Sequence, residues 1–180
     1  MLLANVLEWD YAQYPPGHFD YAHFSPPCSE YSQVMTRRPR RLDEADKLVN
    51  KALEMLLYFR PRWWTIENPY NGFLKTRPIM QFLTPFLKKV SYCMYSEGDE
   101  TWSYRKNTAI WTNIRFTPRA CCKSAPCEWF DGRRHPMWAQ THDPTPFPGR
   151  KIKLTRERVF SMPPALIREW LTCIQAEFLS

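Results

Sequence analysis

Two short apolar segments of the chain end in side chains that can do chemistry. The first runs over Phe19–Phe24 and is followed by Ser25–Cys28, with the sequence SPPC; the second runs over Trp63–Ile66 and is followed by Glu67–Pro69, with the sequence ENP. Both are typical of short buried strands, and proline ends strand pairing because it has no N–H to donate. One strand end therefore offers a thiol and the other a carboxylate. We predict a catalytic site there, because open α/β sheets place their sites outside the carboxyl ends of strands.

Each of these side chains also has a plainer interpretation when it is taken alone. A cysteine outside a disulfide is usually a small buried hydrophobe. A single glutamate after a strand is usually a surface carboxylate. The functional interpretation of Cys28 and Glu67 therefore depends on their occurring together.

The segment between the two motifs predicts how they meet. Asp43–Arg60 is the clearest helix of the sequence, because apolar residues recur in it every three or four positions: Ala45, Leu48, Val49, Ala52, Leu53, Leu56 and Leu57. A strand, a helix and a second strand in this order predict a βαβ unit with parallel strands and a right-handed crossover. Cys28 and Glu67 are then expected at the same edge of one sheet.

The order and spacing of these motifs resemble the cytosine-5 DNA methyltransferases. That family has a Pro-Cys nucleophile motif and, a few dozen residues later, a Glu-Asn motif, which match Cys28 and Glu67. Its arginine-containing strand motif is similar to Tyr104–Thr108, with the sequence YRKNT. The variants ENP and YRK look more like the divergent phage and large-virus branch. The resemblance is clear over residues 5–113 and faint in the tail.

The resemblance implies an α/β fold, a partial Rossmann-like class I methyltransferase sheet with flanking helices. It also implies methyl transfer from S-adenosylmethionine to C5 of a cytosine that has been flipped out of the duplex. In such an enzyme Cys28 would add to C6 of the base, and Glu67 would bond N3 and the exocyclic amine. Arg105 would support the base carbonyl or a nearby phosphate.

Further residues are expected around the substrate and the methyl donor. Arg37–Arg41 reads RRPRR, and arginine forks match phosphate oxygens, although a solvated loop is the plainer interpretation. The expected substrate-binding residues are Pro27, Ser32, Arg37, Arg38 and Asn68. The resemblance implies Asn5 and Pro26 as contacts to S-adenosylmethionine, with Asn5 at the adenine.

The sequence lacks one feature that the resemblance leads us to expect. A cofactor loop of this type needs glycines close together, and the five glycines of the chain are scattered. The chain therefore looks like the catalytic part of a methyltransferase without its cofactor-binding start. It could be one part of a split enzyme with a complementary chain, a shortened reading of a longer gene, or a non-catalytic descendant that binds DNA.

Residues 116–150 have a different character, rich in proline, cysteine, histidine and arginine and without periodicity. This irregular Cys/His-rich lobe lies where the resembled family has its target-recognition segment. It could also hold a structural zinc ion, with Cys93 or His142 completing a tetrahedron. The alternative is a set of unrelated thiols. The predicted zinc ligands are Cys122, Cys127 and His135.

We predict three parts of the chain from these patterns. Residues 1–115 form the catalytic part, 116–150 the irregular lobe, and 151–180 a basic segment with a helix over Pro163–Phe178 that packs on the core. Smaller elements are also expected: a strand in Met1–Tyr11, a helix over Pro78–Lys88, and an edge hairpin of Lys89–Tyr95 with Tyr104–Ile114.

Composition indicates the partner and the compartment. The net charge of +7 favours an anionic partner, DNA first and RNA second, and the 11 Phe, 8 Trp and 9 Tyr could stack on bases as well as fill a core. No apolar run reaches the roughly 20 residues that span a bilayer, and we expect no membrane partner. Six scattered cysteines without a secretory leader predict a reducing, intracellular compartment.

Overall fold

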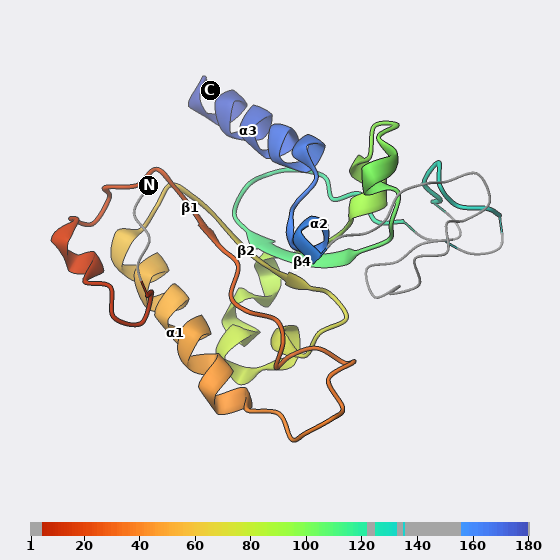
Figure 1. Cartoon of the computed structure of the whole chain (residues 1–180). Coiled ribbons are helices and arrows are strands. Elements are labelled where there is room, and N and C mark those ends of the chain that lie inside the picture. The colour runs from red at the N-terminus through yellow and green to blue at the C-terminus, as the bar shows by residue number, and fades with distance from the viewer. Residues whose placement is uncertain (1–4, 122–124, 133–134, 136–155, 180) are drawn as a thin grey trace. The chain divides into compact units, whose positions relative to one another are not determined.

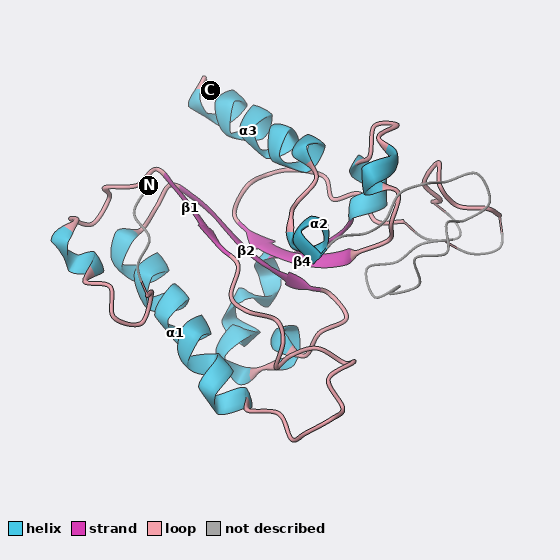
Figure 2. Ribbon diagram, in the orientation of Figure 1, coloured by secondary structure: helices cyan, strands magenta, loops and turns pink. Residues whose placement is uncertain are grey.

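The computed structural model describes residues 5–121, 125–132, 135 and 156–179. They form a mixed α/β fold with a four-stranded sheet in the order β1-β2-β4-β3 (Figures 1 and 2). The strands are β1 Tyr21–Phe24, β2 Trp63–Pro69, β3 Leu87–Ser91 and β4 Asn107–Thr112. The helices are α1 Leu42–Phe59, α2 Arg156–Phe160 and α3 Pro164–Phe178. Five 3-10 helices complete the described elements: Tyr11–Gln13, Leu74–Thr76, Pro78–Phe86, Tyr92–Tyr95 and Glu100–Trp102.

The predicted parallel pairing of the first two strands is confirmed. β1 pairs with β2 in parallel over four residue pairs, from Tyr21 with Trp63 to Phe24 with Ile66. Helix α1 connects them, as the apolar stripe predicted. It ends at Arg60, which adopts a left-handed conformation (φ 48°) and donates its N–H to the carbonyl of Leu56 at 3.0 Å. This is the usual way to terminate a helix, and Pro61 comes next in the chain.

The chain divides into two compact units. The first comprises Met1–Lys88 and Ala109–Ile114, and the second comprises Lys89–Thr108 and Arg115–Ser180. In the first unit, α1, β2 and the 3-10 segments enclose a core of large apolar side chains. Its buried members are Tyr31, Val49, Leu53, Leu56, Trp64, Ile66, Leu74, Met80, Leu83, Ala109 and Trp111.

The N-terminal segment differs from the prediction of a strand. Residues 6–8 form a turn and Tyr11–Gln13 is a 3-10 helix, while Met1–Ala4 lie outside the described residues. The Asp10 carboxylate accepts a hydrogen bond from the Ala12 N–H at 3.2 Å and so caps this short helix. The ring of Tyr11 packs on Phe59 at 5.8 Å between centroids. Aromatic contacts with α1 therefore hold the segment, in place of strand pairing.

Two predicted elements in the middle of the chain have other forms. The segment predicted as a helix over Pro78–Lys88 is a 3-10 helix over Pro78–Phe86. Pro85 lies inside it and has no N–H for an α-helical hydrogen bond, so β3 begins directly afterwards at Leu87. The strand predicted over Lys89–Tyr95 ends at Ser91 and continues as a 3-10 helix.

The second unit contains the predicted C-terminal helix, α3. Ala165, Leu166, Trp170 and Ile174 are buried, whereas Leu171 is exposed. Trp170 packs against Phe116 at 5.9 Å, and Arg119 forms an ion pair with Glu169 at 2.6 Å. Among the described residues, no helix combines the length and the apolar character that crossing a membrane requires.

Candidate active site

The ends of β1 and β2 are linked by two side-chain hydrogen bonds. The hydroxyl of Ser25 donates to Oε2 of Glu67 at 2.8 Å. The amide Nδ2 of Asn68 donates to the carbonyl of Pro26 at 2.9 Å. These bonds continue the register in which Phe24 pairs with Ile66. The turn that leads to Cys28 therefore leaves the sheet at the same edge as Glu67, as the βαβ topology predicted.

Glu67 and Asn68 are both buried at this edge, with 7% and 1% of their surfaces exposed. A buried carboxylate requires hydrogen-bond donors, and Ser25 is one of them. The carbonyl oxygen Oδ1 of Asn68 is buried and accepts no hydrogen bond within the described part of the chain. The site thus places two buried acceptor side chains, Glu67 and Asn68, next to one another at the end of β2.

Tyr31 anchors the turn that carries Cys28. Cys28 is half-buried, and its carbonyl accepts the N–H of Tyr31 at 3.1 Å. The Tyr31 side chain is fully buried, and its hydroxyl donates to Oδ1 of Asp46 on α1 at 2.8 Å. Burial and the neighbouring Asp46 raise the pKa of Tyr31, which keeps the hydroxyl protonated as a donor.

Arg77 completes this anchor. Its Nε donates to Oδ2 of Asp46 at 3.0 Å, and hydrogen bonding to Asp46 raises the pKa of Arg77. Asp46 is 8% exposed, so its charge is buried together with a partner. Tyr31, Asp46 and Arg77 form what we call the anchor triad. It fixes the Cys28 turn to α1 and to the start of the 3-10 segment at Pro78.

The arginine-rich segment after Cys28 is largely bonded to its own loop. Arg38 forms an ion pair with Glu30, and the Arg41 N–H donates to the same carboxylate at 2.7 Å. Hydrogen bonding from Arg38 lowers the pKa of Glu30. Arg40 donates to the carbonyl of Ser32 at 3.0 Å, and Arg37 is exposed. Arg37 is therefore better placed than Arg38 to meet an external phosphate, and the substrate roles of Ser32, Arg37 and Arg38 stay predictions.

Arg105 belongs to the second unit and lies between two anchored residues. The Tyr104 hydroxyl donates to the carbonyl of Arg158, and Lys106 Nζ donates to the carbonyl of Val159, both at 3.0 Å. Arg105 is half-buried, and its Nε is buried without a hydrogen-bond partner among the described residues. Cys28 and Glu67 belong to the first unit, so a shared pocket with Arg105 stays a prediction.

The comparisons with known proteins agree with this arrangement of motifs. No protein-family model matches the chain. The chain is 32% identical over 185 residues to the "Probable DNA (cytosine-5)-methyltransferase" of Frog virus 3 (isolate Goorha), an alignment that covers 93% of this chain and 81% of the relative. The chain belongs to the cytosine-5 DNA methyltransferase family. The predicted resemblance is confirmed.

The described residues do not complete a site for S-adenosylmethionine, the methyl donor that the family implies. Gly17, Gly98 and Gly132 have positive φ angles and open space around them, as turn glycines do. Gly72 lies where a Cβ would be 3.0 Å from the carbonyl of Pro69, so it serves the turn after β2. Asn5 is exposed and accepts the N–H of Leu7 at 3.2 Å.

Pro26, the second predicted contact to the methyl donor, uses its carbonyl to bind Asn68. No glycine-lined cradle is present within the described ranges, which exclude Gly149. The roles of Asn5 and Pro26 stay predictions.

The predicted zinc ligands lie in the second unit. Cys127 and His135 are in contact, with 3.1 Å between Sγ and Nε2. Cys122 lies outside the described residues. Cys121, its neighbour in the sequence, and Cys93 complete a group of four.

Sequence reasoning did not single out Ser25 or the anchor triad. Asp46 reads as an acidic residue near a helix N-terminus, and Tyr31 reads as part of a polar turn. The one available signal was the position of Ser25 directly after β1, level with Glu67 in a parallel pair. That signal becomes visible only once the register is known.

Proposed function

We propose that the chain acts as a DNA cytosine-5 methyltransferase in which Cys28 is the nucleophile. The observation that supports it is the pair of hydrogen bonds, Ser25 to Glu67 and Asn68 to Pro26, that joins the two strand ends bearing the family's motifs. The sheet is proposed as part of a Rossmann-like class I methyltransferase sheet. The relative from Frog virus 3 is named for the same reaction.

The chemistry proposed for Cys28 is addition to the base. C5 of cytosine is a poor nucleophile. The thiol loses its proton, its sulfur bonds to C6, and the electron pair of the C5–C6 double bond moves to C5, which becomes nucleophilic. C5 then bonds to an electrophile, and loss of the C5 proton with cleavage of the S–C6 bond restores the ring. S-adenosylmethionine is the proposed source of the methyl group.

Glu67 is proposed to hold the base during this addition. Its carboxyl group bonds N3 and the exocyclic amine, and so stabilises the charge that develops on the ring. Ser25 is a positioning residue, because its hydroxyl fixes one carboxylate oxygen of Glu67. Asn68 is proposed as a further residue of the substrate site, where its Nδ2 holds the carbonyl of Pro26.

DNA is the proposed substrate, and the base has to leave the duplex to reach Cys28. The net charge of +7 favours binding to the phosphate backbone. Arg37 is the exposed arginine next to the Cys28 turn and is proposed to contact phosphate, while Arg105 is proposed to support the base or a phosphate.

Solvent exchange at C5 tests the covalent step without the methyl donor. Duplex DNA with tritium at cytosine C5 is incubated with the protein. Because the adduct can take a solvent proton at C5 and reverse, tritium should be released into water. Cys28→Ser should reduce release by at least about 1,000-fold. Cys173→Ser is the matched control and should retain the wild-type rate.

Two outcomes would contradict the proposal. Release that survives Cys28→Ser would remove Cys28 as the nucleophile. DNA binding without any release would leave a basic DNA-binding protein without turnover. Trapping with 5-fluorocytosine DNA and S-adenosylmethionine then tests the whole reaction, since the fluorine blocks elimination and the adduct should persist.

A further inference from the structure

Four buried side chains of the second unit bring metal-binding atoms together. The Sγ atoms of Cys93, Cys121 and Cys127 and a ring nitrogen of His135 all lie within 4.8 Å of one another. The four residues are 1%, 2%, 9% and 5% exposed. Cys121, Cys127 and His135 lie in one stretch of the sequence, whereas Cys93 comes from the other side of β4, so the fold brings it to them.

The spacing of these atoms suits a tetrahedral metal ion. Zinc bonds of about 2.3 Å to sulfur and 2.0 Å to nitrogen hold ligand atoms roughly 3.5 to 3.8 Å apart. The four ligand atoms lie within 4.8 Å of one another, and Cys127 Sγ is 3.1 Å from His135 Nε2. Three thiolates and one imidazole are a ligand set that zinc prefers. Four protein ligands leave no open position, which is typical of structural sites rather than catalytic ones.

Hydrogen bonds around the group hold two of its cysteines in place. The Cys121 N–H donates to Oγ of Ser91 at 3.0 Å, and the Ser91 N–H donates to the carbonyl of Arg119 at 2.9 Å. These bonds tie the Cys121 segment to the end of β3, two residues before Cys93. A metal site needs such outer partners to fix the direction of its ligands.

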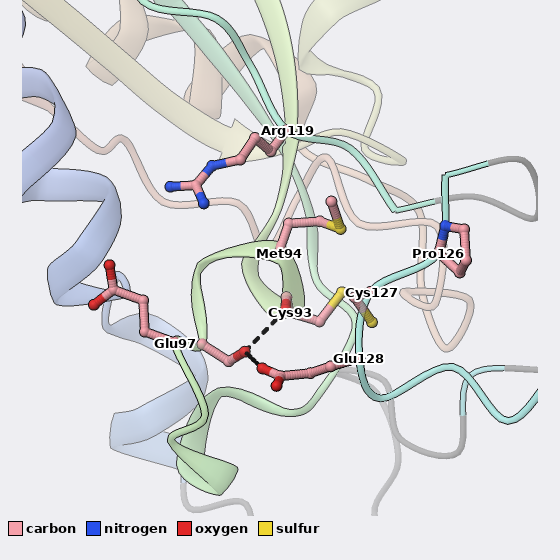
Figure 3. A pocket seen from close by; sticks show the side chains of 8 residues that line it. Cys93, Met94, Glu97, Arg119, Pro126, Cys127 and Glu128 are labelled. Carbon is pink, nitrogen blue, oxygen red and sulfur yellow. Dashed lines mark hydrogen bonds between the residues drawn. The ribbon is translucent and has the colours of Figure 1, made fainter.

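A second set of bonds holds the Cys127 turn. Glu128 accepts hydrogen bonds at Oε1 from Ser96 Oγ at 2.5 Å and from the Gly98 N–H at 3.2 Å. Trp129 Nε1 also donates to Ser96 Oγ at 2.8 Å. Figure 3 shows Cys93, Cys127 and Glu128 on the wall of a pocket, with Ser96 bonded to both the Cys93 carbonyl and Glu128. The pocket gives an ion a path to two of the four ligands.

The described part of the surrounding segment is irregular. Within the described residues from 115 to 135 there is no helix or strand. The sulfurs pack with Met94, Trp129 and Phe130 in a small cluster. Segments of this kind, with few backbone ladders and a small core, usually depend on a crosslink.

We propose that Cys93, Cys121, Cys127 and His135 bind one zinc ion that fixes the Cys/His-rich segment to the end of β3. The ion is structural and takes no part in the chemistry proposed at Cys28. The site is therefore independent of the proposed function, and either proposal can fail while the other stands.

Metal analysis of the purified full chain is the first test. It should find about one zinc per chain, in line with a closed four-ligand site. Replacement with cobalt should give the intense visible bands of a tetrahedral thiolate site. A folded, metal-free protein that shows no cobalt bands after addition of the metal would overturn the proposal. A disulfide between Cys93 and Cys121 or Cys127, detected by mass spectrometry after purification under reductant, would also overturn it.

Variants test the identity of the ligands. Cys121→Ser and His135→Ala should lose zinc, whereas His135→Cys should retain it, because a fourth thiolate replaces the imidazole. Cys173→Ser is the control and should keep the full zinc content. Cys121→Ser and His135→Ala could also fail to fold. The comparison of His135→Ala with His135→Cys then still tests the ligand role, since only a ligand role predicts that cysteine restores both folding and zinc binding. Full zinc content in a folded His135→Ala variant would contradict His135 as a ligand.

Discussion

Two cysteine-containing regions of this chain are built in different ways. Cys28 follows β1, and its turn is held by the strand register and by the anchor triad of Tyr31, Asp46 and Arg77. The group around Cys127 lies among irregular segments joined by side-chain hydrogen bonds. The first region derives its geometry from regular secondary structure, and the second is the one for which we propose a metal crosslink. A residue at a strand end can therefore be placed by topology, whereas a ligand in a loop depends on its partners.

Removal of zinc should produce the largest effect and the sharpest contrast between the regions. We expect a chelator to destabilise the second unit by several kcal/mol, because metal binding free energy at such sites contributes directly to folding. Hydrogen exchange followed by mass spectrometry should show loss of protection over residues 89–108 and 115–121, which belong to the second unit. The amides of α1 should keep theirs. Equal loss of amide protection in both units would contradict a metal that stabilises only the second unit.

Asp46→Ala should have the next largest effect, confined to the first unit. The change leaves the Tyr31 hydroxyl and the Arg77 guanidinium without their buried acceptor. Loss of one partner of a buried pair costs about 3 kcal/mol in the free energy of unfolding. Chemical denaturation measures it. Asp43→Asn is the matched control on the same helix. Asp43 is exposed, and its Oδ1 lies 3.6 Å from Arg77 Nη2. This variant should change the free energy of unfolding by less than about 0.5 kcal/mol.

The same substitution separates position from stability. If the anchor triad holds the Cys28 turn, Asp46→Ala should also slow tritium release from C5 at temperatures where the protein is fully folded. It should leave the zinc content unchanged. Normal release from the folded variant would show that the turn needs no anchor.

Ser25→Ala should impair chemistry while stability changes little. It removes the hydrogen bond to Oε2 of Glu67, and bonds to a charged group are worth about 2 kcal/mol, or roughly 30-fold in rate. The rate of tritium release at saturating DNA should fall by this factor. Ser25→Thr keeps the hydroxyl and should restore most of the rate. An unchanged rate in Ser25→Ala would leave Ser25 as a packing residue.

Ser91→Ala should have the smallest effect, and it tests the second region. The hydroxyl accepts the Cys121 N–H, so its loss frees the backbone beside one proposed ligand. Outer partners of metal ligands typically change metal affinity by about 10-fold when removed. Competition with a chromophoric chelator measures the change. Affinity equal to that of the wild type would indicate that the ligands need no such support.

The sequence was sufficient for the parts of the fold that depend on periodicity. The stripe through Leu48 and Val49 predicted α1, and the order strand, helix, strand predicted the parallel pair. Pro85 was visible in the sequence, but whether a proline shortens a helix or converts it to the 3-10 form depends on the next element of the chain, here β3. The prediction of an N-terminal strand was wrong because Trp9 and Tyr11 pack their rings on Phe59, and the described part of the segment does not pair with the sheet.

The candidate sites show the same division. The strand ends that precede Cys28 and Glu67 could be placed at one edge of the sheet from topology alone, since parallel strands end at a common edge. The zinc group could not be assigned fully, because Cys121 and Cys122 are adjacent in an irregular segment and no periodicity distinguishes them. The anchor triad joins a turn, a helix and a 3-10 segment through side chains, and pairings of this kind leave no pattern in a single sequence.

The four residue pairs between β1 and β2 also set which changes in length the chain can tolerate. Side chains alternate between the two faces of a strand, so a single residue inserted within Tyr21–Phe24 would turn Ser25 to the face opposite Glu67. An insertion between Gln33 and Arg37 would lengthen an exposed loop and leave the pairing of β1 with β2 unchanged. The Ser25–Glu67 bond therefore depends on the register of four residue pairs, whereas the neighbouring loop can change in length without altering that register.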